Sequence, residues 1–152
     1  MENRTFYNEI LTEHNIRPMH KTKMIEPQKT HRGVNPSCGD DITLELNVSD
    51  DGIITDGAFH GDGCAISQAS ADMMLDLVIG RSVEEALSLK EIFLKMIKDK
   101  VTEEELEMLE EAGALKDISH MPSRVKCAVL GWHTLEEMLK GGDSESVSTE
   151  DQ

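Results

Sequence analysis

The sequence of 152 residues is poor in aromatic and basic side chains and contains only three cysteines. Aromatic residues make up 3% of the chain, so a core has to be built from aliphatic side chains and the nine methionines. Thirty acidic against 15 basic residues give a formal charge of −15, which argues against a nucleic-acid groove. The odd cysteine count argues against a disulfide framework and favours reduced thiols, as in the cytoplasm.

Long apolar runs are also missing. No run approaches the length of a membrane-spanning helix, so no membrane partner is expected. The first residues, MENRTFYNEILTEHN, lack the apolar stretch that follows the basic residue of a secretory signal. The length predicts a single domain, and we expect it to be cytoplasmic.

Charge is distributed unevenly along the chain. Residues 1–37 hold six bases and four acids, so the remaining residues carry −17. The acids concentrate in 103–111 (EEELEMLEE) and in the final DSESVSTEDQ. Such runs are typical of a solvated helix face and of a disordered tail, which we place at 141–152.

Alternating apolar residues indicate a small sheet. Over 42–48 apolar and polar residues alternate with the period of a half-buried strand. A turn at 49–52 and a second strand over 53–60 predict an antiparallel hairpin. A third strand is expected near 30–35.

Helical periodicity dominates the rest of the chain. Two capping boxes, Ser82 with Glu85 and Thr102 with Glu105, indicate helix starts. The pattern predicts an α+β domain over 1–140, in which about three antiparallel strands carry helices on one face. The expected helices cover 5–15, 65–79, 83–98 as one helix or two, 102–113 within an inserted acidic segment at about 100–117, and 122 to about 140.

The three cysteines lie at the junctions between these elements. Cys38 and Asp40 flank a glycine in NPSCGD, so their side chains can turn toward one point. Cys64 in GDGC and Cys127 in RVKC are placed at helix starts, where the helix dipole favours the thiolate. Three thiols and a carboxylate make the four ligands of a tetrahedral zinc, although no CxxC pair is present. Each cysteine could instead be a small buried apolar residue.

Three segments, NPSCGD, GDGCAISQASADMM and RVKCAVLGWHTLE, resemble the U-type iron–sulfur cluster assembly family. The resemblance covers roughly residues 5–140 and is closest to the SufU-type branch. IscU-type proteins carry a histidine where this chain has Lys126, and SufU-type proteins carry an extra segment between the second and third cysteines. Here 62 residues separate Cys64 from Cys127.

The resemblance implies a SufE/IscU-like fold that binds zinc through Cys38, Asp40, Cys64 and Cys127. It further implies that Cys38 accepts persulfide sulfur from a pyridoxal-phosphate cysteine desulfurase of the SufS type and passes it to downstream Suf cluster-assembly proteins. Such a chain is a sulfurtransferase that works with the desulfurase rather than a stand-alone enzyme.

Two further residues are candidates for the site. In SufU-type proteins the arginine that matches Arg124 supports activity. Lys126 is either a helix-start residue or a contact for Asp40 or a thiolate.

Two alternative functions remain open from the sequence. The same residues would suit a scaffold on which an iron–sulfur cluster is built transiently, or a structural zinc protein without sulfur transfer. The stretch up to residue 34 departs from the family pattern, so the resemblance assigns it no role. The six histidines are interpreted as surface or packing residues, because none pairs with another at the helical spacing of metal ligands.

Overall fold

The computed structural model describes the backbone of residues 2–141 and 146–148 and the side chains of residues 9–141. Three strands form an antiparallel meander: β1 (Lys29–Asn35), β2 (Asp40–Val48) and β3 (Ile54–Asp62). A short β4 (Ser146–Ser148) pairs in parallel with β1, giving the order β3-β2-β1-β4. The predicted hairpin and the third strand near 30–35 are both confirmed.

The strand β2 shows why the sheet has one buried face. Ile42, Leu44 and Leu46 are fully buried beneath the helices, which confirms the predicted alternation. Glu45 faces the other side but is also buried, because the chain between the first helix and β1 crosses there. Its carboxylate accepts a hydrogen bond of 2.9 Å from the backbone N–H of Met24.

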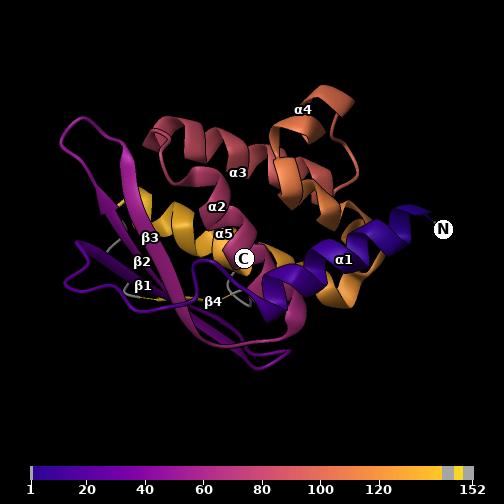
Figure 1. Cartoon of the computed structure of the whole chain (residues 1–152), viewed down its shortest axis with the longest axis horizontal. Helices are drawn as coiled ribbons and strands as arrows, with labels where there is room; N and C mark the ends of the chain where they lie inside the picture. The colour runs from indigo at the N-terminus through magenta and orange to yellow at the C-terminus, as the bar shows by residue number, and fades with distance from the viewer. Residues whose placement is uncertain (1, 142–145, 149–152) are drawn as a thin grey trace.

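The helices lie on one side of the sheet (Figure 1). Their core is aliphatic and methionine-rich, as the composition predicted, and Trp132 stacks on Phe93 with ring centroids 4.9 Å apart. Both predicted capping boxes are present. The helices are α1 (Glu2–Ile16), α2 (Ala65–Val78), α3 (Val83–Ile97), α4 (Glu103–Met108) and α5 (Pro122–Leu139).

The acidic insertion differs from the single helix expected over 102–113. After α4 the chain continues as a 3-10 helix, η1 (Glu110–His120). Glu110 has a φ of 50°, a left-handed conformation that interrupts an α-helix. Leu109, Leu115 and Ile118 are nevertheless fully buried, so the insertion packs on the domain as expected.

The expected disordered tail at 141–152 lies mostly outside the described residues. Within it, residues 146–148 form β4, a pairing that the sequence did not predict. In the part of the chain that the structure describes, no helix combines the length and the apolarity needed to cross a bilayer.

Candidate metal centre

Cys38 and Asp40 are positioned by the turn between β1 and β2. Asn35 pairs with Asp40 across the hairpin, and residues 36–39 form the turn. Gly39 adopts a φ of 73°, which a residue with a side chain rarely does, and the Cys38 N–H donates to the Asn35 carbonyl at 3.2 Å. Cys38 is half-buried in the turn, whereas Asp40 at the start of β2 is 2% exposed.

Cys64 caps the amino end of α2, as its position after two glycines suggested. Its Sγ accepts a hydrogen bond from the Ser67 N–H at 3.4 Å. Its own N–H donates to Asp40 Oδ1 at 2.7 Å, so the start of α2 is fastened to the start of β2. A side chain at Gly63 would collide with Ser67 Oγ and press on Asp40, which explains the glycine before the cysteine.

Cys127 lies in the second turn of α5 rather than the first, and it is fully buried. Its S–H donates to Cys38 Sγ at 3.3 Å. Burial raises the pKa of the Cys127 thiol well above its ordinary value, and the neighbouring Cys38 and Cys64 thiols and Asp40 raise it further. The expectation that the helix dipole favours the Cys127 thiolate is therefore wrong, because burial raises the pKa of this thiol.

Asp40 is held as a carboxylate by the groups around it. Burial acts to raise its pKa, but hydrogen bonds from the Cys64 N–H, Asn35 and Ser67, together with the neighbouring Cys127 thiol, lower it more, so the pKa lies below its ordinary value. Asn35 Nδ2 donates to Oδ2 at 3.0 Å, and Ser67 Oγ donates to Oδ1 at 3.1 Å.

Asn35 and Ser67 were missed from the sequence. Asn35 also donates to Cys127 Sγ at 3.4 Å, so it bridges two candidate ligands. Both residues lie inside the motifs that contain Cys38 and Cys64. A polar residue close in sequence to a candidate ligand could have indicated them, because a polar side chain that is buried there needs a hydrogen-bond partner.

Arg124, in the first turn of α5, lies close to the cysteines. The neighbouring Cys127 thiol, together with the charges of Cys64, Cys127 and Cys38, raises the pKa of Arg124. The group is therefore placed to attract whichever thiol is ionised. Lys126 is half-buried on the same helix turn.

The donor set fits a metal that prefers sulfur. One ligand atom each from Cys38, Asp40 and Cys127 lie within 4.8 Å of one another, the only such group among the described side chains. A tetrahedral zinc with bonds of about 2.3 Å holds neighbouring sulfurs about 3.8 Å apart, so the two sulfurs of Cys38 and Cys127, now 3.3 Å apart, would separate by about half an ångström to share one. The sulfur of Cys64 is not part of this group of three, although its backbone contacts Asp40.

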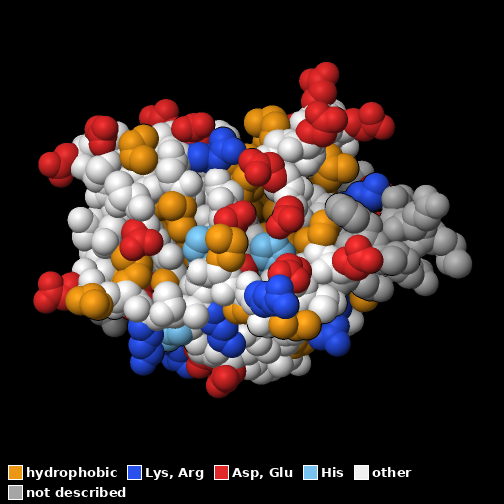
Figure 2. All heavy atoms as spheres, in the orientation of Figure 1, with side chains coloured by type: hydrophobic (Ala, Val, Ile, Leu, Met, Phe, Trp, Pro, Cys, Tyr) orange, Lys and Arg blue, Asp and Glu red, His pale blue; other side chains and the backbone are white. Residues whose placement is uncertain are grey.

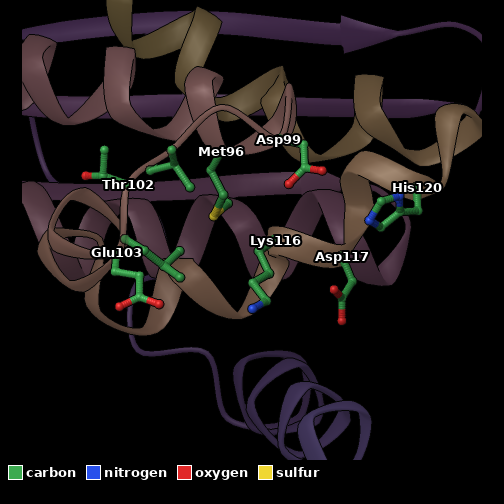
Figure 3. A pocket seen from close by; sticks show the side chains of 9 residues that line it. Met96, Asp99, Thr102, Glu103, Lys116, Asp117 and His120 are labelled. Atoms are coloured by element: carbon green, nitrogen blue, oxygen red, sulfur yellow. The ribbon is translucent and has the colours of Figure 1, made fainter.

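A cavity of about 340 Å³ lies elsewhere, between α3, α4 and η1 (Figure 3). Met96, Val101 and Leu106 contribute apolar surface, and Lys116, Asp117 and other polar side chains complete the lining. None of the candidate site residues lines it.

The protein is a member of the NifU-like N terminal domain family, whose pattern matches residues 6–128. Within that family it belongs with the IscU and SufU proteins. The iron–sulfur cluster assembly scaffold protein IscU of Thermotoga maritima is 41% identical over 134 residues, covering 88% of this chain and 92% of the relative.

The zinc-dependent sulfurtransferase SufU of Bacillus subtilis is 36% identical over 133 residues, covering 88% of each chain. The crystal structure of the SufU protein from Fervidobacterium islandicum AW-1 has a TM-score of 0.80 at 35% identity, and the match covers 86% of this chain and 94% of that one. The predicted fold and the predicted family are thus both confirmed, and the relatives include proteins of both branches.

Proposed function

We propose that this protein accepts persulfide sulfur at Cys38 from a cysteine desulfurase and delivers it to iron–sulfur cluster assembly. The observation that carries the proposal is the contrast between two thiols in contact. Cys38 lies half-exposed in a turn, while Cys127 is fully buried beneath it. Incoming sulfur can reach Cys38 without unfolding α5. The proposal requires Cys38 to be a reduced thiol, and the cytoplasm keeps protein thiols reduced.

The transfer itself needs no outside oxidant or reductant. The Cys38 thiolate attacks the outer sulfur of a cysteine persulfide on the donor and forms a new S–S bond. The donor's S–S bond breaks, and the donor cysteine leaves as a thiolate. Downstream Suf cluster-assembly proteins would then take the sulfur.

Cys38, Asp40, Cys64 and Cys127 would hold zinc. Bound zinc would keep the cysteines deprotonated at neutral pH. The carboxylate of Asp40 would be a harder ligand than the three thiolates. Its oxygens already accept hydrogen bonds from Asn35, Ser67 and Cys64.

Arg124 assists by its charge. Since its guanidinium lies within electrostatic range of all three cysteines, it would stabilise a thiolate released at Cys38 and the anionic persulfide that follows. Arg124→Lys should retain part of the uptake rate, whereas Arg124→Gln should lose more, with zinc content unchanged in both.

The experiment is to incubate the protein with a desulfurase and cysteine, then to locate the added sulfur by alkylation and peptide mass mapping. We expect it on Cys38. Cys38→Ser should abolish stimulation of the desulfurase, and zinc must be measured alongside, because losing a ligand can release the metal.

A scaffold that holds a nascent cluster is the second candidate, favoured by the name of the Thermotoga maritima relative. Persulfide found mainly on Cys127, with Cys38→Ser still zinc-loaded and active, would support the scaffold. A structural zinc role predicts neither sulfur uptake nor desulfurase activation.

A further inference from the structure

The segment from Ile16 to Arg32, here called the α1–β1 segment, has a charge opposite to that of the rest of the protein. It contains five bases and one acid, so the other residues of the chain carry −19. In Figure 2 lysine and arginine side chains gather along the lower part of the molecule, while acidic side chains are most frequent above. The bases are Arg17, Lys21, Lys23, Lys29 and Arg32.

The same segment also exposes apolar surface. Among the side chains that the structure describes, five large apolar ones are exposed, and three of these belong to the segment. Ile16 is 68%, Met19 72% and Ile25 93% exposed. Exposed apolar groups beside cations are typical of a protein-binding surface.

The backbone of the segment is held in place, so its side chains form a fixed surface. Thr22 N–H donates to the Phe59 carbonyl, and Phe59 N–H donates to the His20 carbonyl, each at 2.9 Å. The segment thereby covers the open edge of β3 and then crosses the sheet on the side opposite the main helices (Figure 1). At Gln28, N–H donates to Asn47 Oδ1 at 2.8 Å.

This surface adjoins the candidate metal centre. Asn15, the residue before the segment, donates from Nδ2 to the Ala65 carbonyl at 3.1 Å. Lys21 Nζ contacts Gln68 Oε1, and Gln68 Nε2 donates to the Gly63 carbonyl at 2.6 Å. Through Lys21 the segment therefore contacts the first turn of α2, which Cys64 caps.

We propose that the α1–β1 segment is the docking surface for the sulfur-donating desulfurase, which meets it with an acidic surface that has apolar side chains at its centre. The inference rests on the proposed function. A partner bound here lies beside the site that receives the sulfur, and opposite charges accelerate the encounter. Nucleic acid fits less well, because the segment has no Phe, Tyr or Trp side chain for base stacking and the whole chain repels polyanions.

The test uses Lys21→Glu/Lys23→Glu, with Lys98→Glu/Lys100→Glu as the matched control, because all four lysines are exposed and the charge change is equal. Binding to the cysteine desulfurase of the same organism is measured by calorimetry at low and high salt. We expect Kd to rise about tenfold or more for the segment variant at low salt, with a smaller salt dependence, and to change little for the control.

The apolar contribution is tested separately. Met19→Ser/Ile25→Ser should weaken binding at both salt concentrations, whereas Met108→Ser, an exposed methionine on α4, should not. An unchanged Kd in both segment variants overturns the docking surface. An equal rise in Kd for the lysine control also overturns the docking surface. The same holds if the segment variants alter only self-association or binding to anionic vesicles.

A second readout separates this inference from the proposed function. Each variant is given cysteine persulfide as a small-molecule donor, and sulfur on Cys38 is quantified. Normal uptake with lost desulfurase binding supports the docking surface. Normal binding with no sulfur on Cys38 in the unmodified protein overturns the proposed function alone.

Discussion

His14 on α1 and Asp72 on α2 form a buried ion pair in which Nδ1 lies 2.6 Å from Oδ2. The other ring nitrogen, Nε2, lies 2.8 Å from Glu111 Oε1 on η1. Asp72 Oδ1 accepts a further hydrogen bond of 2.8 Å from the backbone N–H of His20. Protonated His14 can donate to both carboxylates, so it links the first helix, the second helix and the insertion.

This pair predicts a pH-dependent stability. The hydrogen bond to Asp72 raises the pKa of His14 to about 8, against the opposing effect of burial. The difference from the ordinary 6.5 corresponds to about 2 kcal/mol of folding free energy. Because the folded-state pKa is raised, this contribution is complete below pH 6.5 and is lost as the pH rises through 8.

Urea unfolding between about pH 6 and about pH 9 checks the prediction. The advantage of the unmodified protein over His14→Gln should shrink by about 2 kcal/mol across that range. A difference from His14→Gln that stays constant with pH would contradict the assignment.

Zinc should bind with a stoichiometry of one per chain. X-ray absorption should show sulfur-rich ligation with Zn–S distances near ~2.3 Å. Chelation should lower Tm and make three thiols titratable, because metal binding is coupled to folding. Nitrogen-rich ligation, or no metal after purification without chelators, would remove the assignment.

Asp40→Ala should lower stability and sulfur transfer more than Asp41→Ala, the same change at the neighbouring surface residue. The change leaves the buried donors of Asn35, Cys64 and Ser67 without their acceptor, at a cost of about 1–3 kcal/mol. We expect a lower Tm, retained zinc and slow or absent sulfur transfer. Asp41→Ala serves as the control because Asp41 pairs with Arg32 at the surface, 2.6 Å apart. Transfer at the unmodified rate in Asp40→Ala would exclude Asp40 from the mechanism.

Neutralising the exposed acids of α4, with Glu103→Gln, Glu104→Gln and Glu107→Gln together, should leave zinc content unchanged. Leu109→Ala should instead destabilise the fold by about 2–5 kcal/mol, because that side chain is fully buried. Loss of metal from the glutamine variant would show that the insertion contributes to the site.

Much of the fold was readable from local patterns. The alternation over β2 predicted a strand, and its buried residues follow that alternation. The two capping boxes predicted the starts of α3 and α4, and both sets of capping hydrogen bonds are present. The break at Glu110 was not readable, because a glutamate gives no local sign of a left-handed conformation. The pairing of β4 with β1 was also missed, since a three-residue strand has too little periodicity to detect.

The site was predicted by motif rather than by geometry. The turn of Cys38 and the cap at Cys64 follow from adjacent glycines, which the sequence displays. The burial of Cys127 does not, because it depends on how α5 packs beneath the β1–β2 turn. The contact of His14 with Asp72 spans 58 residues and gives no sequence signal at all.

The thiols of Cys38 and Cys127 meet across 89 residues of sequence. During synthesis, at about 5–20 residues per second, the ribosome releases Cys38, Asp40 and Cys64 well before α5 emerges. A nascent or truncated chain therefore presents only an incomplete ligand set. We expect metal loading to be a late, post-translational event, so that unfinished chains do not compete with finished ones for zinc or sulfur.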